Sequence, residues 1–233
     1  MNWSERMGEC VVVEGYAVGS RKVGPELLNA RFSIGVILEE GDWPDELVGG
    51  HVRVEGTVAE RHDLPVFIAR EGEPIQQGIP VPEGTNLEEA RRRYVLDKAT
   101  AARVRSQQQV EEDLLSQQGK VVTLTGIIWS LNGHWWFNHD GIDMHVKDWS
   151  RIPGWSADMH GRPAALHGRL SREMLPRIDQ IVVKPEPDLA QAYLLSGVTL
   201  EPHPEWRPMP CQHADSAHSP DVSSSARITA PTP

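Results

Sequence analysis

Several residue types and patterns are scarce in this chain of 233 residues, and each scarcity excludes some classes of protein. Cysteine occurs only at positions 10 and 211, which are too few and too far apart for a disulfide framework or a zinc motif. We therefore expect a reducing cytoplasm, with Cys10 as a small buried hydrophobe. No apolar run approaches the length of a membrane span, and the first residues do not read as a secretory signal, so we expect no membrane partner.

Sequence motifs of the common enzyme classes are also missing. The chain has no P-loop, no G-x-S-x-G nucleophile elbow, no H-E-x-x-H zinc motif and no dinucleotide-binding fingerprint. The sequence therefore names no catalytic residue and no cofactor. A non-catalytic protein is the leading hypothesis, and a metal-dependent enzyme is the third alternative.

What the chain does contain is a β-rich pattern that occurs twice. Segment 8–15 reads G-E-C-V-V-V-E-G and segment 119–126 reads G-K-V-V-T-L-T-G, an offset of 111 residues. The strand around Gly56 recurs around Gly168, an offset of 112 residues. Apolar and polar residues alternate in these strands, which is typical of a sheet with one face on a core. We therefore predict two similar β units, over residues 8–69 and 119–184.

Each unit is predicted to have five strands, with a longer break between the third and the fourth. In the second unit, Asn132-Gly133 and Asp140-Gly141 are hairpin signals. This order resembles the OB-fold, a small Greek-key barrel. The first unit, with W-P-D-E-L-V-G-G-H-V-R-V-E-G-T-V, also resembles small bacterial proteins of unassigned function. The resemblance implies a fold but no activity, because OB-folds host many unrelated functions.

The predicted fold class is mainly β, with two tandem five-stranded OB-like barrels joined by a long helix. Residues 1–69 form the first barrel, and 65–69 are its fifth strand. Residues 70–118 comprise a Pro/Gly linker and a helix that begins at the capping box Thr85-x-x-Glu88. Residues 119–200 form the second barrel, with a fifth strand at 178–184 and a helix at 188–196. Residues 201–233 are rich in Pro, Ser and His, which predicts a disordered tail.

The net charge of −10 is concentrated in the first unit. Residues 1–85 carry 7 Lys or Arg against 15 Asp or Glu, and the acidic residues cluster at Glu39, Glu40, Asp42, Asp45 and Glu46. This cluster is either a solvated edge or a docking surface for a basic partner. Our leading hypothesis is a binding module for another macromolecule, a protein in the first instance, such as an acidic inhibitor or immunity-like protein.

Aromatic and basic residues gather in the second unit, and three interpretations compete for them. The tryptophans fill the barrel while the histidines are solvated. Alternatively, an exposed platform binds single-stranded nucleic acid, through Trp135, Trp136, His145, His167, Arg169 and Lys147. A metal site is the weakest candidate, because no spacing matches a known ligand pattern, and it would use His139, His145, His167 and Asp143.

Overall fold

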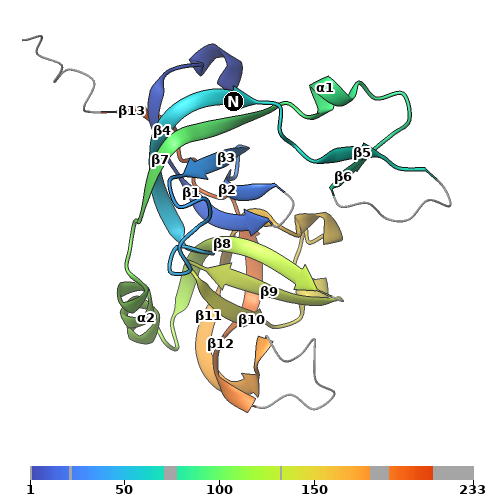
Figure 1. Cartoon of the computed structure of the whole chain (residues 1–233). Coiled ribbons are helices and arrows are strands. Elements are labelled where there is room, and N and C mark those ends of the chain that lie inside the picture. Colours follow the sequence, from blue (N-terminus) through green and yellow to red (C-terminus); the bar gives the residue numbers. More distant parts are fainter. Residues whose placement is uncertain (1, 21–22, 71–77, 132, 179–188, 212–233) are drawn as a thin grey trace, which may run out of the picture.

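The computed structural model describes residues 2–20, 23–70, 78–131, 133–178 and 189–211, and β-strands dominate it (Figure 1). Two closed five-stranded barrels follow one another along the chain, the first above the second in Figure 1. In each barrel the third strand pairs in parallel with the fifth. The prediction of a mainly β chain with two OB-like barrels is confirmed at this level.

The first barrel consists of β1 (Cys10–Ser20), β2 (Gly24–Asn29), β3 (Phe32–Leu38), β4 (His51–Arg61) and β7 (Arg93–Arg103). They follow the order β1-β2-β3-β7-β4, and pairing between β1 and β4 closes the barrel. The predicted alternation in β4 is confirmed, because Val52, Val54 and Val58 are buried and Arg53 is exposed. Trp3, in the short helix η1 (Trp3–Arg6), is buried in the same core.

The prediction for the fifth strand of this barrel is wrong. Within the predicted strand 65–69, β5 (Val66–Ile68) pairs with β6 (Ile79–Val81) in a separate two-stranded sheet. The long helix predicted from Thr85 is also wrong. A single helical turn, α1 (Leu87–Ala90), is followed by β7, and among the described residues only α2 (Gln107–Ser116) is a longer helix. β7 buries Val95, Leu96 and Ala99 in the barrel, and this tertiary burial overrides the helical pattern.

The second barrel consists of β8 (Val121–Leu131), β9 (His134–His139), β10 (Ile142–Val146), β11 (Arg162–Pro176) and β12 (Leu189–Glu201). The turns η2 (Trp149–Arg151) and η3 (Ala157–Met159) lie in the long break between the third and fourth strands. The core centres on Phe137, Met144 and Leu166. Val110 and Leu114 of α2 are buried in the same core, so this helix belongs to the second barrel.

The hairpin predicted at Asp140-Gly141 is confirmed, and both residues have positive φ, 51° and 88°. The fifth strand is β12, not the predicted 178–184, of which 179–184 lie outside the described residues. The helix predicted at 188–196 is wrong, because 189–201 form a strand. Side chains alternate between the two faces of β12, so that Tyr193 and Leu195 are buried in the core. This burial again overrides the helical pattern.

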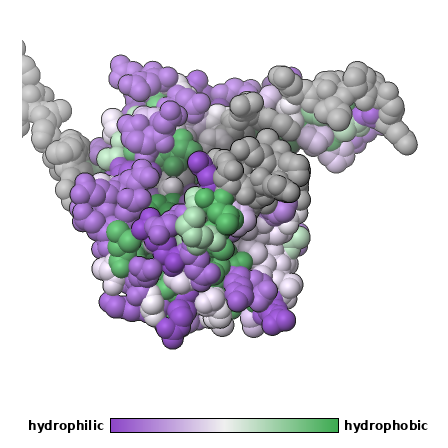
Figure 2. Space-filling model, turned by 90° about the horizontal axis from the view of Figure 1, so that it is seen from below, coloured by the Kyte–Doolittle hydropathy of each residue, from purple (hydrophilic) through white to green (hydrophobic). Residues whose placement is uncertain are grey.

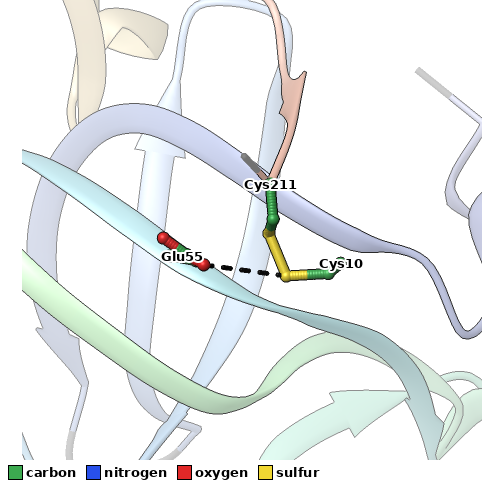
Figure 3. Close-up of a disulfide and its surroundings, with 3 residues drawn as sticks. All are labelled: Cys10, Glu55 and Cys211. Atoms are coloured by element: carbon green, nitrogen blue, oxygen red, sulfur yellow. Dashed lines mark hydrogen bonds between the residues drawn. A yellow bond between two sulfur atoms is a disulfide. The ribbon is translucent and has the colours of Figure 1, made fainter. Parts of the chain in front are cut away.

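Residues 202–211 run from the second barrel back to the first, and we call this segment the strap. Its β13 (Met209–Pro210) pairs antiparallel with Val11 and Val12 of β1. Beyond it, Cys211 forms a disulfide with Cys10, beside Glu55 (Figure 3). The predictions of unpaired cysteines, a buried Cys10 and disorder from residue 201 are therefore wrong for this part of the chain. The remainder of the predicted tail, 212–233, lies outside the described residues.

No helix among the described residues is both long enough and apolar enough to cross a membrane. Figure 2 shows the molecule from the side of the second barrel, and apolar residues there form small patches separated by polar ones.

Candidate functional site

The five predicted acidic residues all lie on the connection between β3 and β4, and all are exposed. Three of them, Glu39, Glu40 and Asp42, line a cleft of about 260 Å³ together with Leu38, Pro44 and Leu47. The opposite wall is Ala99, Thr100 and Ala101 of β7. We call this the acidic cleft. Asp45 and Glu46 are on the same connection but outside the cleft lining.

The cleft is hollow because the side chains of β7 are small at this point. A second hollow of about 360 Å³ continues it along β7, past Asp97 and Lys98. The two hollows share Leu38, Glu39, Ala99 and Thr100. The acidic connection is held in place by Trp43, which is buried in the first-barrel core and donates from Nε1 to the carbonyl of Val18 at 2.9 Å. The wall of the cleft is therefore anchored.

An edge of β7 is open inside the acidic cleft. β3 ends at Leu38, which pairs with Ala99, whereas β7 continues to Arg103 with β4 as its partner. Within the described chain, no backbone hydrogen bond joins the 39–50 connection to Thr100, Ala101 or Ala102. A strand edge with unpaired N–H and C=O groups can accept a further strand. The cleft thus combines acidic side chains with a strand edge that is not paired on this side.

The structure separates the two tryptophans of the predicted nucleic-acid platform. The half-buried Trp135 packs on the second-barrel core, with its ring centroid 4.5 Å from that of Trp155. Its carbonyl accepts a hydrogen bond from Trp149 Nε1 at 3.1 Å. Trp136 precedes the inward-facing Phe137 and so lies on the other face of β9, paired across the strands with Trp129.

Three of the other residues predicted for that platform contact groups in different parts of the second barrel. His145 lies 2.9 Å from the carbonyl of Pro176 and His167 Nδ1 lies 2.9 Å from Thr123 Oγ1, whereas Arg169 donates to the carbonyl of Gly119 at 2.7 Å. Burial lowers the pKa of His145. Lys147 is exposed at a separate hollow that it shares with Asp148 and Arg151.

The four residues of the predicted metal site are not brought together in the described chain. There, the only group of three or more metal-ligating side chains with their atoms within 4.8 Å of one another is Cys10, Glu55 and Cys211. Two of these three are joined in the disulfide. Asp143 accepts a hydrogen bond from Asn138 at 2.7 Å, whereas His139 is buried with its Nδ1 against the carbonyl of Thr125.

Sequence reasoning missed a charged junction between the barrels. Asp140, in the β9–β10 turn of the second barrel, is only 1% exposed. Its Oδ1 accepts a hydrogen bond from the backbone N–H of His51 at 2.6 Å, and its Oδ2 accepts one from Arg105 Nε at 3.2 Å. Arg103 donates to the Asp140 carbonyl at 3.1 Å. A buried carboxylate needs such partners, so this residue fixes the position of one barrel on the other.

Two histidines at this junction, His139 and His51, have pKa values that burial lowers. His139 donates from Nδ1 to the carbonyl of Thr125 at 2.7 Å, and burial lowers its pKa. Burial also lowers the pKa of His51, and its Nε2 lies 3.5 Å from Glu14 without hydrogen-bond geometry. The sequence signal here was only the N-H-D-G turn, which indicates a hairpin but not what its carboxylate contacts.

Comparisons of the chain with protein-family models, curated proteins and solved structures found no match. The function is therefore argued from the geometry of this molecule.

Proposed function

We propose that the protein is a non-catalytic binding module whose first barrel recognises a basic segment of another protein in the acidic cleft. The observation that carries this proposal is the open edge of β7 facing Glu39, Glu40 and Asp42 across the cleft. An added strand would gain main-chain hydrogen bonds from Thr100 to Ala102, and lysine or arginine side chains would pair with the acidic wall. An inhibitor or immunity-like role against a basic protein fits this chemistry.

Electrostatics supports the same partner class. Residues 1–85 carry 7 basic against 15 acidic side chains, so a basic protein is attracted and a nucleic acid is repelled. The disulfide favours an oxidising compartment over the reducing cytoplasm expected from the cysteine count.

The test uses a synthetic octapeptide of alternating lysine and valine, with an alternating glutamate and valine peptide as its counterpart. We expect the basic peptide to bind, to weaken with added salt, and to shift the amide resonances of Thr100 to Ala102. N-methylation of every second peptide bond removes the donors of one strand edge and should abolish binding if a strand is added.

Charge reversal supplies a matched pair of variants. Changing Glu39 and Asp42 to lysine alters the cleft, whereas changing Asp45 and Glu46 to lysine alters net charge equally and leaves the lining intact. We expect the first pair to weaken peptide binding at least about tenfold more than the second. Equal loss in both pairs, or binding of a single-stranded oligonucleotide in preference to the peptide, would contradict the proposal.

A further inference from the structure

The strap places an aromatic side chain on a set of first-barrel residues that we call the Trp206 seat: Tyr16, Asn29 and His51. The rings of Trp206 and His51 stack, with centroids 4.0 Å apart and planes 10° apart. Tyr16 lies against the same indole, with centroids 5.4 Å apart. Asn29 donates from Nδ2 to the Trp206 carbonyl at 3.0 Å. The seat therefore contacts both the ring and the backbone carbonyl of Trp206.

Two of the three seat residues, Asn29 and His51, are also held by contacts that do not involve the strap. Tyr16 and Asn29 lie on β1 and β2 of the barrel. Asn29 also donates to the carbonyl of Glu14 at 3.1 Å, and the backbone of His51 is held by Asp140. A site that is held in this way keeps its shape when its occupant changes, which favours binding.

The composition of the strap is typical of an extended segment that another segment of similar sequence can replace. Four of its ten residues are proline, at 202, 204, 208 and 210, and these lack a backbone donor. Such a segment is extended before it binds, and proline-rich segments dock on aromatic surfaces in this state. Besides the disulfide and the two-residue β13 bridge, the strap is tied by an ion pair between Arg31 and Glu205 and a 3.4 Å contact between Tyr16 and His203.

We propose that the Trp206 seat is a binding site for an extended, proline-rich, tryptophan-containing segment of another protein, and that the strap blocks it until the Cys10–Cys211 disulfide is reduced. A dithiol supplies two electrons and two protons, the S–S bond breaks to give two thiols, and the dithiol becomes a disulfide. The seat is separate from the acidic cleft, so this proposal and the proposed function fail independently.

The strap and an external segment compete for the seat, and the disulfide favours the strap. The reason is that a tethered ligand is present at a high effective concentration. A short tether gives an effective concentration on the order of millimolar, and a covalent closure at the far end prevents the strap from leaving. An external segment should therefore be excluded from the oxidised protein and admitted by the reduced one. Removing the indole from the strap should open the seat further.

The experiment measures binding of a fluorescein-labelled peptide of residues 202–210 to full-length variants by fluorescence anisotropy. In Trp206→Ala/Cys211→Ser, kept in a thiol reductant, the seat is free. In the matched control Trp136→Ala/Cys211→Ser, a tryptophan of the second barrel is removed and the strap still carries its own indole. We expect the first variant to bind at least about 30-fold more tightly than the oxidised wild-type protein, with the control between them.

A peptide in which the tryptophan is replaced by alanine should bind about 30-fold more weakly, since truncating a central aromatic anchor has an effect of this size. Failure of a variant with a native circular dichroism spectrum to bind at about 1 mM peptide would overturn the proposal. Equal binding to the oxidised wild-type protein would overturn it too, and so would tighter binding of a single-stranded oligonucleotide than of the peptide.

A second measurement keeps the test valid should the double variant fold poorly. The single variant Cys211→Ser retains Cys10, whose thiolate can attack a peptide of residues 202–211 that carries its terminal cysteine as a mixed disulfide with 2-thiopyridine. The new S–S bond joins Cys10 to the peptide, and 2-thiopyridone leaves with the electron pair of the broken S–S bond. The pairing of Val11 with Pro210 predicts that the native sequence reacts about tenfold faster than a scrambled peptide with the same terminal cysteine. Equal rates would show that the peptide does not occupy the seat.

Discussion

Replacing Asp140 by asparagine should destabilise the contact between the two barrels while leaving the backbone in place. The residue has φ +51°, and asparagine adopts this left-handed conformation as readily as aspartate. The change removes the negative charge and turns one of the two acceptor oxygens, which bind His51 and Arg105, into an NH2 donor. It leaves Arg103 and Arg105 facing a neutral group, and Arg103 is the more buried of the two, with 12% of its side chain exposed.

The size of the effect follows from this burial. Removing one partner of a buried ion pair costs about 3–5 kcal/mol of unfolding free energy. Arg105 is 36% exposed and can be hydrated, and it keeps its ion pair with Asp113 at 3.2 Å. We therefore expect the lower end of the range, about 3 kcal/mol, which is a large part of the stability of an ordinary domain.

Urea unfolding followed by tryptophan fluorescence and by circular dichroism measures this loss. Asp148→Asn is the matched control, because Asp148 has φ +58° but is exposed on the same barrel, and its substitution should change stability by less than about 0.5 kcal/mol. A double-mutant cycle with Arg105→Met should show coupling of at least about 1 kcal/mol. A loss in Asp140→Asn no larger than in Asp148→Asn would refute this reasoning.

Three further predictions concern stability. Gly126→Ala should lower the unfolding free energy by about 3 kcal/mol, since its Cβ would lie 2.1 Å from the Asn138 carbonyl oxygen, whereas Gly19→Ala, with nothing within 4 Å, should be nearly neutral in denaturant titrations. Because burial lowers the pKa of His139 below 6.5, the unfolded chain binds more protons below that pH, so the melting temperature should fall on acidification and fall less in His139→Gln. Cys211→Ser should cost at most about 5 kcal/mol in the chain-entropy model, for a separation of 201 residues, and calorimetry that shows no loss would contradict a docked strap.

The strands that alternate along the chain could be predicted from the sequence, whereas β7 could not. In β4, the valines at 52, 54 and 58 repeat with a period of two, and the barrel core contains all three. β7 reads R-Y-V-L-D-K-A-T-A-A-R, and its alanines and charged residues are good helix formers. Only the neighbouring strands β3 and β4 make this segment extended, and such long-range pairing leaves no local signal.

A candidate site could be predicted from the sequence only where its residues lie close together along the chain. The acidic wall of the cleft is contiguous in sequence, so its charge could be read directly, but the open edge of β7 opposite it could not. Asp140 and His51 are 89 residues apart, and the hydrogen bond between them depends on how the barrels meet. The strap has the composition of a disordered tail, and it is ordered by the partners that Trp206 and Cys211 find on the first barrel.

The disulfide also changes the covalent connectivity of the chain. The bond between residues 10 and 211 closes nearly the whole described molecule into a covalent ring that contains both barrels and the segment between them. A single peptide-bond cleavage anywhere inside this ring, for instance in the connection between β7 and α2, would leave both barrels covalently attached. Two fragments would separate only after reduction, so the protein tolerates one proteolytic nick as an intact particle for as long as its surroundings remain oxidising.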